Sequence, residues 1–141
     1  MVIAVDFDGT IVEHKYPAIG KERMFAFQTL KMMQADGHLL LLWTIRHGEL
    51  LDEAVEYCKK NGVVFYAVNK NYPEEEFDGT FSRKLNADLF IDDRNVCGFM
   101  GWGPIWQEIV KVAPSKFEKS SMSKPTSFDR PSFWKRLAGG I

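Results

Sequence analysis

The sequence has few cysteines, almost no net charge and no long apolar run. Among its 141 residues, Cys58 and Cys97 are the two cysteines, and their spacing excludes a CxxC metal-binding pair. We expect both to be reduced thiols, as in a cytosolic protein. The formal net charge of −1 provides no overall field that favours nucleic acid or a membrane surface.

Signals for membrane insertion and for export are also missing. The longest apolar run, residues 39–43, is far shorter than the ~20 residues that a membrane-spanning helix needs. Met1 is followed directly by Val2, with no basic segment and no long apolar segment of a signal peptide. We therefore expect a cytoplasmic protein, long enough for one domain with a single buried core.

Short apolar runs alternate with amphipathic segments along most of the chain. The apolar runs predict strands at residues 2–5, 39–43, 63–66 and 88–91. Apolar residues at helical spacing predict helices at residues 22–35, 48–61 and 104–112. This alternation predicts right-handed crossovers and a central parallel sheet, and hence an α/β, Rossmann-like three-layer sandwich.

The chain divides by composition into two parts. Residues 1–113 contain all the predicted strands and helices and form the expected domain. Residues 114–141 are rich in Ser, Lys and Pro before an aromatic, basic end. We expect this tail to be partly disordered or packed on a neighbouring molecule, and the sequence gives it no chemical role.

Two acidic pairs follow predicted buried strands. Asp6 and Asp8 follow the first strand, and Asp92 and Asp93 follow the last. The carboxyl ends of parallel strands lie at one edge of a sheet, where such folds hold ligands. Neighbouring buried carboxylates repel one another unless a cation compensates, and Mg²⁺ with oxygen ligands is the natural choice. The alternatives are a solvated Asp-Gly turn for the first pair and an acidic helix N-terminus for the second.

Three further residues have side chains suited to a phosphate site. Thr44 ends the leucine-rich strand and offers a hydroxyl and a backbone N–H. Arg46 follows it closely, and Lys84 precedes the last strand. Each of these is common without any such function, so their value lies in their order relative to the two acidic pairs.

This ordered set resembles the haloacid dehalogenase superfamily, in particular its phosphatases. The resemblance covers residues 1–112 and depends on four features: the motif Asp6-Phe7-Asp8-Gly9-Thr10, Thr44, Lys84, and the run Ile91-Asp92-Asp93. Residues 86–94 also resemble the matching stretch of deoxyribonucleotidases.

The resemblance implies a Mg²⁺-dependent phosphomonoesterase with an aspartyl-phosphate intermediate. Asp6 would be the nucleophile, and Asp8 would protonate the leaving oxygen and then activate water. Thr44 and Lys84 would hold the phosphoryl oxygens, with Gly9 as a further phosphate contact.

The resemblance also implies a set of metal ligands. Mg²⁺ would be bound by the Asp6 side chain, the Asp8 backbone carbonyl and Asp93. Asp92 would bind through water or orient Lys84. Arg46 is a further expected contact to phosphate or substrate.

Members of this superfamily often carry a cap domain over the site, and this chain is too short between its motifs to contain one. We expect an open, capless site that suits a large or extended substrate, or one that a neighbouring subunit of a homo-oligomer closes. Residues 12–21 would form a small flap. Small generic phosphate esters would then be hydrolysed with weak affinity.

Three other functions compete with this prediction. A nucleotidase or polynucleotide-end phosphatase is favoured by the deoxyribonucleotidase-like stretch, and its partner would be a phosphorylated macromolecule end rather than a small substrate. A non-catalytic phosphate-binding regulatory module would be expected to have lost Asp6 or Asp8. A phosphoacceptor receiver domain would need an aspartate at the end of a middle strand, and Thr44 stands there instead.

Overall fold

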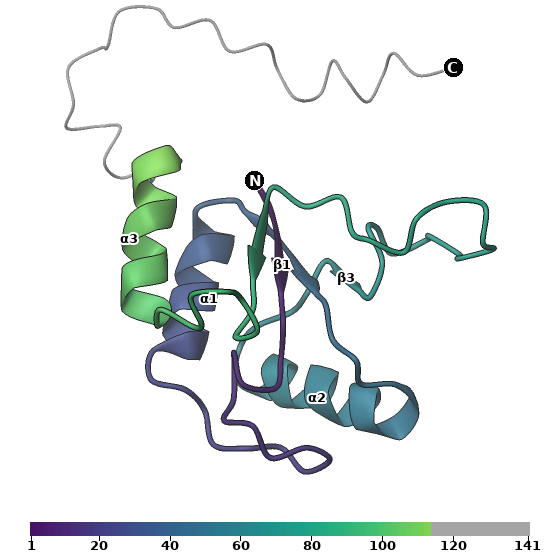
Figure 1. The fold of residues 1–141 in the computed structure, drawn as a ribbon, viewed down its shortest axis with the longest axis horizontal. Helices are drawn as coiled ribbons and strands as arrows, with labels where there is room; N and C mark the ends of the chain where they lie inside the picture. The colour runs from purple at the N-terminus through teal and green to yellow at the C-terminus, as the bar shows by residue number, and fades with distance from the viewer. Residues whose placement is uncertain (114–141) are drawn as a thin grey trace, which may run out of the picture.

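Four short parallel strands form the centre of the protein, whose structure is a computed structural model that describes residues 1–113. The strand order across the sheet is β3-β2-β1-β4 (Figure 1). The elements are β1 (Val2–Val5), α1 (Ala26–Ala35), β2 (Leu39–Leu42), α2 (Gly48–Lys60), β3 (Ala67–Val68), β4 (Leu89–Ile91) and α3 (Trp102–Val112). The predicted α/β fold with a parallel, Rossmann-like sheet is confirmed.

Strand β1 is paired on both sides, and this pairing aligns three strand ends. Val5 lies opposite Leu42 of β2 and Ile91 of β4. The pairing continues one residue further on each side: Trp43 N–H donates to the Val5 carbonyl (2.8 Å), and Asp6 N–H donates to the Ile91 carbonyl (2.9 Å). The residues after the three strands therefore emerge side by side at one edge of the sheet.

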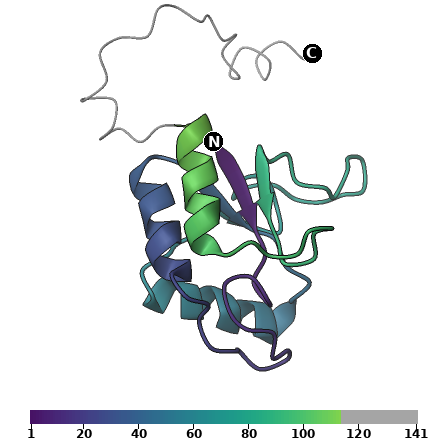
Figure 2. The ribbon, with the colours of Figure 1, turned by 60° about the vertical axis from the view of Figure 1, so that its left-hand side comes forward.

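The two faces of the sheet are covered by different kinds of structure. On one face, Val5 and Leu42 pack with buried residues of all three helices, among them Leu30, Cys58 and Ile105. Figure 2 shows the helices gathered on this side of the strands.

The opposite face is covered by an irregular segment, residues 69–88. Ala4 and Leu41 pack there against Leu85, with Ala87 partly buried beside them. The three layers are therefore helices, sheet and irregular segment, and no helix covers this second face within residues 1–113.

Two predicted elements differ from the structure. The predicted helix at 22–35 begins later, at Ala26, because Phe25 adopts a left-handed conformation (φ 66°) that a helix cannot contain. The predicted strand at 63–66 is wrong, since the third strand is β3. Val63 is buried and Phe65 packs against the core, but pairing with β2 begins only at Tyr66, whose N–H donates to the Leu40 carbonyl (2.8 Å).

Other predictions about the chain have separate outcomes. No helix in the described part of the chain is long and apolar enough to cross a membrane. Cys58 is buried, Cys97 is exposed, and both are free thiols. The predicted tail, residues 114–141, lies outside the described residues.

Candidate active site

Three carboxylates meet at the edge where the central strands end. Asp6 follows β1, and Asp92 and Asp93 follow the neighbouring β4, so the register of the two strands brings them together. One oxygen from each of the three lies within 4.8 Å of the others. The predicted convergence of the two acidic motifs is therefore present, with Asp6 at its centre.

Thr10 and Gly9 hold this cluster together. The Thr10 hydroxyl donates to Asp6 Oδ2 (3.0 Å) and accepts from the Asp93 backbone N–H (3.0 Å). A β-carbon added to Gly9 would lie 2.2 Å from Asp93 Oδ2, and Gly9 has a φ of +91°. Only glycine allows this approach, so the first motif and the last fit against each other through these two residues.

The cluster has the donors and the electrostatics of a site for a hard divalent cation. Burial and, secondarily, the Asp92 carboxylate raise the pKa of Asp6 from its ordinary 3.8 to about 7. Asp93 Oδ1 is buried without a hydrogen-bond partner. A cation bound between these oxygens would offset the repulsion and satisfy the unpaired acceptor, so the residues present fit the Mg²⁺ site that the sequence predicts.

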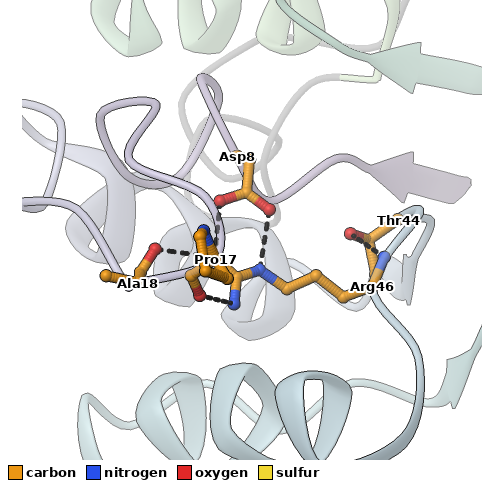
Figure 3. Close-up of polar contacts among 5 residues, drawn as sticks. All are labelled: Asp8, Pro17, Ala18, Thr44 and Arg46. Carbon is orange, nitrogen blue, oxygen red and sulfur yellow. Dashed lines mark hydrogen bonds and ion pairs between the residues drawn. The ribbon is translucent and has the colours of Figure 1, made fainter.

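Asp8, the second acid of the motif, turns away from the cluster and pairs with Arg46. Arg46 Nε donates to Asp8 Oδ2 and Arg46 Nη2 to Asp8 Oδ1, each at 2.7 Å (Figure 3). This bidentate pair is almost completely buried, with side-chain exposures of 0% for Arg46 and 6% for Asp8. Hydrogen bonding to Asp8 raises the pKa of the Arg46 guanidinium above its ordinary value.

Arg46 also fastens the flap, residues 12–21, to the body of the domain. Its remaining donors bond to the carbonyls of Pro17 and Ala18, both at 2.9 Å (Figure 3). Its guanidinium lies 5.0 Å from the centroid of the Phe7 ring and 5.3 Å from that of Tyr16. One side chain therefore orients Asp8 and sets the position of the flap.

The strand ends and the flap line an open pocket of about 230 Å³. Its lining includes Asp6, Asp8 and Asp92, together with His14 and Tyr16 of the flap. The other lining residues are Trp43, Thr44, Ile45 and Arg94. The pocket lining thus combines three carboxylates with aromatic, apolar and basic side chains.

Thr44 lies in this pocket with its hydroxyl hydrogen still available. Its backbone N–H donates to Asn69 Oδ1 (2.8 Å), and its Oγ1 accepts from Arg46 N–H (3.2 Å). The hydroxyl can therefore still donate to a ligand. The expected N–H contact to phosphate is not available in this arrangement, because Asn69 takes that donor.

Three predicted phosphate contacts have other positions or partners. Gly9 N–H donates to the Val12 carbonyl (2.8 Å), and Arg46 is buried and engaged with Asp8 and the flap. Lys84 does not line the pocket, and its ammonium lies 5.9 Å from the centroid of the Phe90 ring. In this structure, Gly9 N–H and the Arg46 guanidinium are therefore engaged within the protein, and Lys84 is not beside the acids.

Sequence reasoning also missed several residues of the site. Thr10 ends the motif Asp6-Phe7-Asp8-Gly9-Thr10, and its hydroxyl group is the feature that could have identified it as a partner of the acids. Arg94 follows the last acidic pair directly and supplies a cation at the pocket. Asn69 has no local signal, because its contact with Thr44 depends on how β3 is placed beside β2.

The raised pKa of Asp6 predicts that the free energy of unfolding of the metal-free protein falls as pH rises. The folded state retains the Asp6 proton up to about pH 7, whereas the unfolded chain releases it near its ordinary pKa of 3.8. Stability is therefore lost as pH rises from about 4 to 7, by up to about 4 kcal/mol at ~1.4 kcal/mol per pKa unit. Asp6→Asn should remove this loss.

Urea unfolding in EDTA measures this effect as the difference between Asp6→Asn and wild type. We expect Asp6→Asn to gain stability relative to wild type between pH 4 and pH 8, and Mg²⁺ to stabilise wild type more than the variant. Asp52→Asn, at an exposed carboxylate of α2, is the matched control. Equal pH dependence of Asp6→Asn and wild type would contradict the prediction.

The Asp8–Arg46 pair predicts a large effect of a single substitution. Arg46→Met leaves the Asp8 carboxylate buried without its partner, which costs about 3–5 kcal/mol in comparable pairs. Chemical denaturation measures the free energy of unfolding. Lys111→Met is the control, since the Lys111–Glu108 pair is exposed and worth less than about 1 kcal/mol. Equal losses for the two variants would mean that the buried pair is not a structural constraint.

Comparison with known proteins gives one informative relative. No family model matches the chain, and no curated protein is significantly similar to it. A solved structure of a conserved protein from Bacteroides thetaiotaomicron is 57% identical in sequence, with a TM-score of 0.74. The match covers 87% of this chain and 98% of the other. At that identity over nearly the whole of both molecules, the chain belongs to the same protein family as the conserved Bacteroides protein.

Proposed function

We propose that the protein is a Mg²⁺-dependent phosphohydrolase that uses Asp6 as its nucleophile. The observation that carries the proposal is the position of Asp6, a carboxylate that lines an open pocket with two further carboxylates beside it. Such a group is poorly placed for a structural role, because it pairs with no basic side chain within residues 1–113. The resemblance of the motifs to haloacid dehalogenase phosphatases agrees with this assignment.

Asp6, Asp92 and Asp93 are the side chains that would hold the metal. When bound, Mg²⁺ would neutralise charge on the carboxylates and on a phosphate, and so reduce the repulsion between nucleophile and substrate. The repulsion is substantial, since two unit charges ~4 Å apart interact by about 4 kcal/mol at an effective dielectric constant of 20. Thr10 orients the nucleophile through its bond to Asp6 Oδ2, leaving Oδ1 for attack.

The reaction proceeds in two displacements at phosphorus. An Asp6 oxygen attacks, the bond to the leaving oxygen breaks, and Asp8 donates the proton that this oxygen takes up. Asp8 then accepts a proton from water as that water attacks the aspartyl-phosphate, which releases inorganic phosphate and frees Asp6. Because both Asp8 oxygens accept hydrogen bonds from Arg46, a proton on Asp8 would weaken at least one of these bonds.

A nucleotidase or polynucleotide-end phosphatase is the second candidate. Tyr16 and Trp43 line the pocket beside the acids, and aromatic rings of this kind can stack on a nucleobase. Both candidate enzymes hydrolyse a phosphate monoester by the same steps, so they differ only in the leaving group of the substrate. A substrate panel separates them.

Phosphate release tests the proposed reaction. We expect the wild-type protein to release inorganic phosphate from phosphate esters with Mg²⁺ and to lose activity in EDTA. Asp6→Asn should lower the rate by at least ~1000-fold, because the covalent step is lost. The panel contains sugar phosphates, nucleotides, and oligonucleotides with a 5′- or 3′-phosphate.

The control for this experiment is Asp52→Asn, which removes an exposed carboxylate and should leave the rate unchanged. Circular dichroism confirms that each variant is folded. A folded, Mg²⁺-bound wild type that releases no phosphate from any ester would refute the enzyme and favour a module that only binds phosphate.

The position of the basic residues predicts which one assists the reaction. Arg94 lines the pocket, whereas the Lys84 ammonium lies beside Phe90. Arg94→Ala should therefore reduce kcat/KM by about tenfold or more, as expected for loss of a charged hydrogen bond of 1.5–3 kcal/mol. If Lys84→Ala has the larger effect, the Lys84 side chain swings to the phosphate in the complex, as the motif resemblance implies.

A further inference from the structure

A second cavity of about 380 Å³ adjoins the candidate active site. The two cavities share Trp43, Thr44 and Ile45, which form a common wall where β2 ends. The second cavity continues from this wall over the irregular segment that contains Lys70 and Arg83. A ligand that occupies both would therefore lie across the Thr44 hydroxyl, with one end at Asp6.

The walls of the second cavity are aromatic and basic. The Arg83 guanidinium lies 4.2 Å from the centroid of the Phe77 ring, and Phe81 packs edge-on against Phe77 with centroids 5.2 Å apart. Both rings remain more than 40% exposed. The stacking holds the guanidinium in place while its N–H groups stay available at their edges.

Lys70 is the second cation of this cavity. Its ammonium donates to the Pro73 carbonyl (2.6 Å), which fixes its position and leaves two further N–H donors. Glu75 also lines the cavity, but both of its carboxylate oxygens accept hydrogen bonds from Asn71. The groups still free to bind a ligand are therefore mainly cationic donors.

The charges of the two cavities are opposite in sign. The first contains Asp6, Asp8 and Asp92 against Arg94, and it needs a metal ion before it can accept an anion. The second contains Lys70 and Arg83 against Glu75 alone, because Arg46 there is paired with Asp8, and its two cations can bind an anion directly. A molecule with one anionic group at each end matches this pair of cavities better than a molecule with a single phosphate.

We propose that the second cavity is a binding subsite for a phosphate group that is not transferred, so that the substrate carries two phosphates. Lys70 and Arg83 bind the second phosphate, and Phe77 and Phe81 contact the part of the substrate between the two groups. The second phosphate comes either from a bisphosphorylated small molecule or from the next residue of a nucleotide chain. This inference rests on the proposed function only for the identity of the group that reacts.

Matched substrates test the subsite by kinetics. Fructose 1,6-bisphosphate is compared with fructose 6-phosphate, and a 5′-phosphorylated thymidine dinucleotide with thymidine 5′-monophosphate. For at least one pair, we expect wild type to favour the two-phosphate compound in kcat/KM by about tenfold or more, as for two charge-assisted contacts. The pair that shows the preference identifies the source of the second phosphate.

Substitution of the two cations should remove this preference selectively. Lys70→Ala/Arg83→Ala should lose it and keep kcat/KM for the one-phosphate compound within about twofold of wild type, because neither residue touches the acids. Lys59→Ala/Lys60→Ala removes the same charge from the exposed end of α2 and should retain the preference. A preference that survives in the first variant, or that is absent from wild type for both pairs, would overturn the inference.

Calorimetry separates failure of the subsite from failure of the proposed function. The full-length Asp6→Asn protein with Mg²⁺ is titrated with the same four compounds, so that binding is measured without turnover. Tighter binding of a two-phosphate compound that Lys70→Ala/Arg83→Ala abolishes would support the subsite even if wild type releases no phosphate. Phosphate release by wild type, with equal Kd values within both pairs, would overturn the subsite and leave the proposed reaction intact.

Discussion

The pairing of β1 with both of its neighbours is the constraint on which the site depends. Val5 is level with Leu42 and Ile91, so three chain segments leave the sheet at the same height. This alignment brings Asp6 and Asp92 together, although most of the domain lies between them in the sequence. A shift of one residue in either pairing would turn alternate side chains to the wrong face and separate the carboxylates.

The buried pair of Asp8 and Arg46 adds a second constraint, which acts on the flap. A buried ion pair contributes little net stability by itself, since its attraction must offset the loss of hydration of both charges. The pair instead orients its surroundings, because the guanidinium fixes the position of Asp8 and donates hydrogen bonds to the carbonyls of Pro17 and Ala18. Tyr16, which lines the pocket, is therefore placed by a residue that does not line it.

The strand ends and the acids that follow them could be predicted from the sequence, because both depend on short local patterns. An apolar run followed by acids marks the ends of β1 and β4, so Asp6, Asp92 and Asp93 follow from the motif and the parallel sheet. The third strand could not be predicted, because its position is set by contacts with β2 rather than by the β-branched run before it. The partner of Asp8 lies 38 residues away, and spacing alone gives no sign that Arg46 turns inward.

Arg94 lines the pocket, but within residues 1–113 no basic side chain is paired with the three clustered carboxylates. The buried guanidinium of Arg46 is paired with Asp8 and bonded to the flap rather than to Asp6. The other acids of the cluster, Asp92 and Asp93, only add to the negative charge beside Asp6. Within residues 1–113 the repulsion among these groups is relieved either by protonation of Asp6 or by an ion from solution. In the proposed mechanism, protonation would remove the nucleophile whereas a bound ion would preserve it, so the proposed reaction would require the ion.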